Sequence, residues 1–108
     1  MAIFVVSERA NGEFQFVLRS DSGSALLMSE GYTSASARDN GIESVRKNAE
    51  DEGRYAHLES TNGKLYFNLK AGNGQVIGSS PMFEGEAART DAMKVVMSEA
   101  ASAKVEEQ

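Results

Sequence analysis

The chain has 108 residues, a formal net charge of −5 at pH 7 and no cysteine. This length suits one compact domain, and a composition of 41% hydrophobic and 25% charged residues excludes a disordered or collagen-like chain. A chain without cysteine has no disulfides, thiolate metal sites or thiol nucleophiles. Because the sequence shows no signal-peptide pattern and no long apolar segment, it predicts a cytoplasmic protein that does not enter a membrane.

Two strands joined by a tight turn are predicted first along the chain. Residues 3–7 and 14–19 carry alternating apolar side chains and flank Asn11-Gly12. An Asn-Gly pair between two strand-like segments is typical of a two-residue type I′ hairpin, because both central residues of that turn need a positive φ. A second turn at residues 21–23 leads into a third short strand, residues 25–29, which completes an antiparallel meander.

A helix is predicted after the third strand, where the period of the apolar residues changes from two to about 3.6. Ile42 and Val45 lie on one helical stripe, and the helix is expected to cover residues 34–49. Thr33 or Ser34 is available as the N-cap.

The whole unit then occurs a second time. Gly12 aligns with Gly63, and Val45 aligns with Val96 without a gap. An internal repeat of this kind indicates one supersecondary unit used twice, with the second helix expected over residues 86–101. The predicted organisation is a single domain, 1–108, made of repeat 1 (residues 1–51), repeat 2 (residues 52–103) and a frayed tail (residues 104–108).

One shared core follows from the size of the repeats, since a unit of about half this chain buries too little surface to be stable alone. The strands of both repeats must join in one sheet if no unpaired edge is to lie in the middle. The prediction is an α+β fold: two tandem β3-α repeats that form one mostly antiparallel six-stranded sheet, with both helices on one face. The repeats would be related by an approximate internal two-fold axis, as in a pseudo-dimer.

The predicted turn also determines which side chains the helices leave uncovered. A two-residue loop pairs Val5 with Leu18, and Phe4 then points to the opposite face. The outer face is expected to be partly aromatic, and its candidate partner surface consists of Phe4, Val6, Val17, Tyr55, His57 and Tyr66. The orientation of the third strand stays open, because a one-residue change in loop length would exchange Leu26 and Met28 with their neighbours.

A set of short motifs recurs in this tandem arrangement. It comprises the Asn-Gly turns, the strand end Ser29-Glu30-Gly31-Tyr32 and the helical segment Gly41-Ile42-Glu43-Ser44-Val45. With these motifs the chain resembles the YegP-like family of small bacterial proteins, a family of unknown function. The resemblance covers nearly the whole chain and implies a single sheet whose helices are exchanged, so that each packs on the other repeat's strands. It implies no catalytic residues.

No residue set for catalysis or cofactor binding stands out. His57 is the only histidine, so a metal site would have to depend on carboxylates. Ser29 and Ser80 recur at equivalent positions without a Gly-x-Ser-x-Gly turn, and we expect them to make turn or cap hydrogen bonds. Arg38 and Arg89 also match, which favours ion pairs or stems packed over the core. We therefore expect no enzymatic activity, no cofactor and no metal.

Two functional hypotheses follow. The first is a protein-interaction module whose outer sheet face or exposed strand edge meets another protein or a second copy. The alternative is a small-ligand binder with a pocket between helices and sheet, where Gly41 and Ala92 could leave room. Nucleic-acid binding is not expected, because the chain is acidic and helix cations such as Arg46 lie beside acidic residues.

Overall fold

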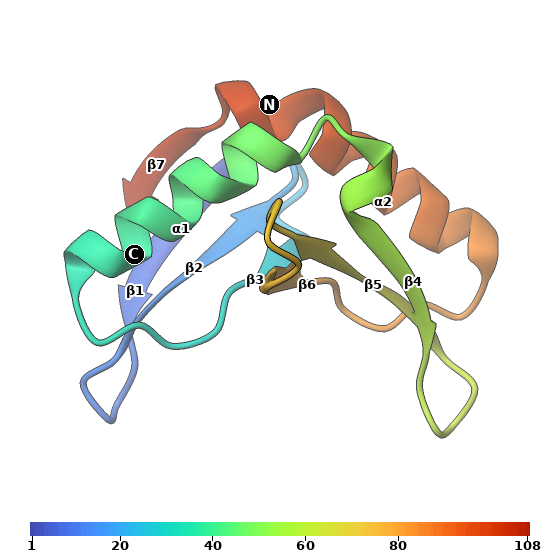
Figure 1. The fold of residues 1–108 in the computed structure, drawn as a ribbon, viewed down its shortest axis with the longest axis horizontal. Coiled ribbons are helices and arrows are strands. Elements are labelled where there is room, and N and C mark those ends of the chain that lie inside the picture. Colours follow the sequence, from blue (N-terminus) through green and yellow to red (C-terminus); the bar gives the residue numbers. More distant parts are fainter.

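A computed structural model describes residues 1–108 as one sheet with two helices on one of its faces (Figure 1). The predicted α+β class and the two helices are confirmed. The strands are β1 (Ile3–Glu8), β2 (Phe14–Arg19), β3 (Ala25–Met28), β4 (Tyr55–Glu59), β5 (Leu65–Lys70), β6 (Val76–Ser79) and β7 (Lys104–Glu107). The helices are α1 (Ala35–Asn48) and α2 (Glu86–Glu99), with short 3₁₀ turns η1 (Glu52–Arg54) and η2 (Ala100–Ser102).

The sheet has seven strands in the order β4-β5-β6-β3-β2-β1-β7. β3 and β6 meet antiparallel in the middle, and the two meanders extend from there as similar halves (Figure 1). The predicted six-stranded sheet is therefore wrong by one strand. Instead of fraying, residues 104–107 pair as β7 in parallel with β1, which makes the sheet mixed. The edge of β1 supplies hydrogen-bonding partners that the tail sequence by itself does not reveal.

All four hairpin loops share one geometry, which differs from the type I′ turn predicted for the Asn-Gly hairpins. The Arg9 N–H donates to the Glu13 carbonyl and the Gly12 N–H donates to the Arg9 carbonyl, as in a type I turn followed by a glycine bulge. Gly12 has a φ of 87°, whereas Asn11 has no positive φ. The same bonding pattern recurs at Gly23, Gly63 and Gly74.

The longer loop shifts the pairing of β1 with β2 by one residue. Phe4 lies opposite Leu18 and Val6 lies opposite Phe16, so all four side chains point toward the helices. Phe4 is fully buried and packs edge-on against Phe16, with ring centroids 5.7 Å apart. The prediction that Phe4 and Val6 lie on the outer face is therefore wrong, because a one-residue slip moves every side chain of a strand to the other face.

Both helices cover the same face and bridge the two repeats. The Ser34 hydroxyl caps α1 by accepting a hydrogen bond from the Ala37 N–H at 3.0 Å. α1 contacts β2 of its own repeat and β5 and β6 of the other, while α2 contacts β5 and also β3. The helix exchange that the family resemblance implies stays a prediction, because each helix contacts strands of both repeats. Neither helix is long and apolar enough to cross a bilayer.

Near the two-fold axis the two repeats cannot carry the same side chains. Leu27 of β3 is fully buried, Met28 beside it points outward, and the residue equivalent to Leu27 in β6 is Gly78. A Cβ atom on Gly78 would lie 2.7 Å from Leu27 Cγ. One leucine therefore fills a volume that two symmetric side chains would have to share.

A second complementary pair lies where α1 meets the sheet. Gly41 faces Tyr32 so closely that a Cβ atom on the glycine would lie 2.8 Å from Tyr32 Cζ. In the second repeat the equivalent residues are Phe83 and Ala92. The phenylalanine lacks the hydroxyl group, and the helix carries a methyl group in its place. The second repeat therefore combines a ring without the hydroxyl group and a helix residue with a methyl group, which is the combination that avoids the clash that a Cβ atom on Gly41 would make.

This comparison predicts a compensating pair of substitutions. Gly41→Ala alone should destabilise the protein by about 1–3 kcal/mol, because the new methyl group meets the Tyr32 ring. Tyr32→Phe/Gly41→Ala copies the second repeat and should recover that loss, helped by the better helix propensity of alanine, worth about 1 kcal/mol. Urea unfolding measures both variants. A double variant that is no more stable than Gly41→Ala would contradict this account.

Candidate functional site

The six residues of the candidate partner surface are not brought together by the fold. Phe4, Val6 and Tyr55 are buried in the core, with Tyr55 only 8% exposed. His57 is exposed, but it lies on the helix side of β4, opposite Phe67. Val17 and Tyr66 do lie on the outer face, as predicted, but on β2 and β5, in different halves of the sheet.

The outer face carries two apolar areas, of which the sequence analysis identified only Val17 and Tyr66. In the first repeat a row across the strands consists of Val5, Val17 and Met28, paired directly from β1 to β3. In the second repeat the apolar pair is Leu58 with Tyr66, at the outer end of the sheet. The three-residue turns decide this arrangement, since they set which residues of β1 and β4 point away from the helices.

A hollow of about 450 Å³ lies on the outer face where the repeats meet, and we call it the junction hollow. Met28 and Val76 are the large apolar side chains most exposed there, at 39% and 42%. The hollow is lined by Arg9, Gln15, Val17, Met28, Ser29, Glu30, Val76, Ile77, Gly78 and Ser79. Because the face orientation of the third strand was open in the sequence, Met28 and Val76 could not be assigned to this site beforehand.

One end of the junction hollow is polar and held in place by hydrogen bonds. Arg9 Nε donates to Gln15 Oε1 at 2.6 Å, and Gln15 Nε2 donates to the Ser7 hydroxyl at 3.1 Å. Arg9 Nη1 also lies 3.7 Å from a carboxylate oxygen of Glu13. The residue equivalent to Arg9 is Ser60, so this charged rim exists in one repeat only.

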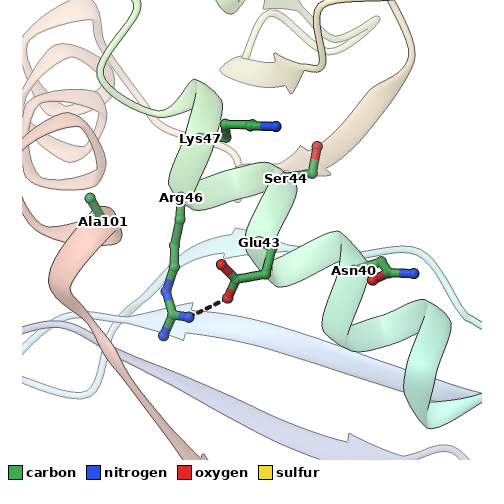
Figure 2. Close-up of a pocket in the computed structure, with 6 residues that line it drawn as sticks. All are labelled: Asn40, Glu43, Ser44, Arg46, Lys47 and Ala101. Carbon is green, nitrogen blue, oxygen red and sulfur yellow. Dashed lines mark hydrogen bonds and ion pairs between the residues drawn. The ribbon is translucent and has the colours of Figure 1, made fainter.

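A second, larger hollow of about 570 Å³ lies along α1 and is shown in Figure 2. Arg46, one of its two cationic residues, forms an ion pair with Glu43 through Nη1 and donates through Nη2 to the Ala103 carbonyl at 2.7 Å. The guanidinium also lies over the Phe4 ring, 5.5 Å from its centroid. Arg46 therefore acts as a structural link between α1, β1 and the segment that enters β7.

The matched serines have structural roles, as expected. The Ser29 hydroxyl accepts a hydrogen bond from the Phe16 N–H at 2.9 Å and donates to the Glu30 carbonyl at 2.8 Å. The Ser80 hydroxyl makes the equivalent bonds in the second repeat, at 2.9 and 2.8 Å. Both side chains are buried, and each replaces a backbone partner where β3 or β6 leaves the ladder. Each hydroxyl donates its proton to a backbone carbonyl and not to a side-chain base.

The matched arginines lie where the helices begin. Arg38 pairs with Asp39 at 3.1 Å, and its guanidinium carbon lies 5.7 Å from the Phe14 ring centroid. Arg89 donates to the Leu58 carbonyl at 3.3 Å and lies 4.0 Å from Glu86. Both side chains are largely buried along their stems, at 15% and 13% exposure, which agrees with the predicted ion pairs and packed stems.

Tyr55 and His57 have helix-side contacts in β4. The Tyr55 hydroxyl donates to the Ala49 carbonyl at 2.7 Å, and burial raises the pKa of this phenol well above its usual value near 10. His57 Nε2 lies 3.3 Å from the sulfur of Met93 on α2. Tyr55 thus ties the end of the first repeat to the first strand of the second.

Residues 10–55 and 60–107 each match a protein family described as a domain of unknown function, DUF1508. The chain belongs to the DUF1508 family. One match falls mainly in each repeat, so the internal duplication and the resemblance to YegP-like proteins are confirmed. No activity is known for this family.

Named relatives of this DUF1508 chain are bacterial. It is 48% identical over 96 residues to the UPF0339 protein in the ptx operon 5′ region of Stutzerimonas stutzeri, which covers 89% of this chain and 86% of that protein. It is also 48% identical over 80 residues to the UPF0339 protein YegP of Escherichia coli K12, which covers 74% of this chain and 73% of that protein. Neither name states a function.

Two solution NMR structures show the same DUF1508 fold. The UPF0339 protein SO3888 from Shewanella oneidensis superposes with a TM-score of 0.92 at 42% identity, over 98% of this chain and 90% of that chain. The protein of unknown function yegP from E. coli superposes with a TM-score of 0.93 at 39% identity, over 99% of this chain and 92% of that chain.

Ser29→Ala should destabilise the protein by about 1–3 kcal/mol, because it leaves the buried Phe16 N–H without an acceptor. Ser80→Ala should cost a similar amount at the equivalent site. Ser22→Ala, at an exposed turn position, is the matched control and should change stability by less than about 0.5 kcal/mol. Urea unfolding measures all three variants, and equal stability of Ser29→Ala and Ser22→Ala would contradict the assignment.

The raised pKa of Tyr55 predicts a loss of stability at alkaline pH. The folded state favours the neutral phenol, so this contribution is fully present below the unfolded pKa near 10 and is lost as the pH rises through the folded pKa. Tyr55→Phe should be less stable by about 1 kcal/mol at pH 7, where a hydrogen bond is lost. Its stability should fall less steeply above pH 10. Parallel stability curves from pH 7 to 11 would contradict the prediction.

Proposed function

We propose that this protein is a non-enzymatic, cytoplasmic protein-interaction module that binds a partner protein through the outer face of its sheet. The observation that carries the proposal is the exposure of Met28 and Val76 together at the junction hollow, on the face that neither helix covers. Exposed apolar side chains that gather around a polar rim are typical of protein-binding surfaces. Methionine is a flexible side chain that adapts to different partners.

The proposal of a non-enzymatic role is supported by the use of the candidate reactive groups. The hydroxyls of Ser29 and Ser80 both donate to backbone carbonyls and accept from backbone N–H groups. His57 contacts the Met93 sulfur and no serine or carboxylate. No nucleophile, base and orienting group therefore lie together as acid–base or nucleophilic catalysis requires.

Protein is favoured over nucleic acid as the partner because several helix cations are neutralised locally. Arg38 pairs with Asp39, Arg46 with Glu43, and Arg89 with Glu86. With a net charge of −5, few phosphate contacts could release counterions, so binding to a nucleic acid should be weak.

We further infer that the helices are exchanged in the sense that each stabilises the other repeat's strands. α1 contacts β5 and β6, and α2 contacts β3. Such bridging would prevent the repeats from separating and would present the outer face as one rigid surface.

A small-ligand binder is the alternative. One hollow, of about 340 Å³, does lie between a helix and the sheet, lined by Ala35 and Arg38 of α1 and by residues of β1, β2 and β7, but neither Gly41 nor Ala92 lines any of the three hollows. Gly41 and Ala92 reflect close packing instead. The junction hollow, at about 450 Å³, also falls in the size range of ligand pockets, so the alternative includes a site on the outer face.

Met28→Glu/Val76→Glu should abolish recovery of the partner by in-cell crosslinking while the protein remains folded, because both side chains are exposed and two charges would oppose burial. Met82→Glu/Val105→Glu makes the same chemical changes at exposed residues that do not line the junction hollow and should retain the partner. Equal recovery by both variants would contradict the proposal. A thermal shift of the wild type with a metabolite, lost in Met28→Glu/Val76→Glu, would favour the ligand-binding alternative.

A further inference from the structure

The two edges of the sheet differ in how they are protected. β7 forms one edge, and all four of its residues are exposed, including Lys104, Glu106 and Glu107. Charged side chains of this kind discourage pairing with another strand. β4 forms the other edge and carries a single formal charge, Glu59, with no proline, lysine or bulge. β4 is therefore the edge open to a further strand.

The hydrogen-bonding groups of β4 that face this open edge can be identified from the ladder. The N–H of Phe67 donates to the Ser80 hydroxyl and its carbonyl accepts from the Ser80 N–H, so the polar groups of Phe67 face β6. His57 lies opposite Phe67, and in an antiparallel pair its N–H and carbonyl then point away from β5. The carbonyl of Tyr55 points the same way, whereas its N–H donates to the Glu52 carbonyl.

The equivalent edge in the first repeat already holds a strand. β7 pairs in parallel with β1, and the Gln108 N–H donates to the Val6 carbonyl at 3.0 Å. Val6 is the residue equivalent to His57, so the added strand uses the backbone groups that β4 leaves open. The first strand of each repeat can thus accept a parallel strand in the register that β7 shows. This edge is occupied by β7 on β1 and is open on β4 (Figure 1).

Side chains around the open edge favour an acidic occupant. In the first repeat Glu107 lies opposite Val6 and lines the same hollow as Arg38. In the second repeat Arg89 holds the equivalent position to Arg38, and His57 replaces Val6. An acidic side chain placed opposite His57 would therefore meet two nitrogen-bearing groups.

We propose that the free edge of β4 binds an extended acidic segment of a partner protein, added as a parallel strand in the register that β7 takes on β1. The added chain would bond to the carbonyl of Tyr55 and to the N–H and carbonyl of His57. An apolar residue of the segment would lie beside Tyr55, as Val105 lies beside Phe4. This strand-edge site is separate from the junction hollow, so either surface can be tested without the other.

The test uses a synthetic peptide with the sequence of residues 103–108 of this chain, acetylated at its amino terminus, added to the intact ¹⁵N-labelled protein. Saturable shifts of the Tyr55, His57 and Glu59 amide signals, with those of Phe4 and Val6 unchanged, are the expected result. The peptide with Glu107→Gln should bind about threefold more weakly, since it lacks the charge placed near Arg89.

Two controls test whether binding depends on backbone hydrogen bonds. A peptide N-methylated at the position of Gln108 cannot donate to the His57 carbonyl and should lose the shifts. His57→Pro removes the edge N–H and should also lose them, whereas the matched variant His57→Ala keeps the backbone groups and should retain most of the binding. The N-methylated peptide gives the same answer if His57→Pro does not fold.

Three outcomes would overturn the proposal. Shifts at Phe4 and Val6 would mean that the peptide only replaces β7. An absence of saturable shifts would mean that β4 does not accept this strand. Shifts at His57 that grow with protein concentration without peptide would mean that the edge pairs with a second copy of the chain.

Discussion

The register of the four hairpins is the constraint on which the rest of the structure depends. Each loop is a type I turn closed by a glycine with a φ near 87°, and this loop is one residue longer than a type I′ connection. The extra residue turns Phe4 and Val6 toward the helices and leaves Val5 and Leu58 outside. The core, the outer face and the position of the candidate site all follow from that choice.

A duplicated unit that shares one core meets a packing limit at its symmetry axis. Where two equivalent positions approach each other, one must be small, as for Leu27 and Gly78. Farther from the axis, a larger residue at one position goes with a smaller residue at its neighbour in the same repeat. The first repeat has Tyr32 with Gly41, and the second has Phe83 with Ala92. The divergence of the repeats at these positions therefore has a steric cause, because protein interiors are packed to near-crystalline density.

The symmetry is also broken at the edges of the sheet. Arg46 links α1 to the Ala103 carbonyl and to the Phe4 ring, and so holds the segment that leads into β7. The equivalent residue of α2 is Met97, whose side chain has no hydrogen-bond donor. The segment after α1 leads through η1 into β4, whereas the segment after α2 leads into β7. The edge of β1 is therefore covered by a charged strand, while the outer edge of β4 carries no strand and lies beside Met93 of α2.

The sequence by itself determined the duplication, the α+β class, the two helices with the Ser34 cap, and the structural roles of Ser29 and Ser80, because these depend on local periodicity, capping chemistry and internal repetition. Tertiary structure decided the faces of β1 and β4, since Asn-Gly is compatible with loops of two or three residues and one residue reverses a strand. It also decided that residues 104–107 form a strand, because their pairing requires the edge of β1. The junction hollow lies where β3 meets β6, so its residues emerged only from the assembled sheet.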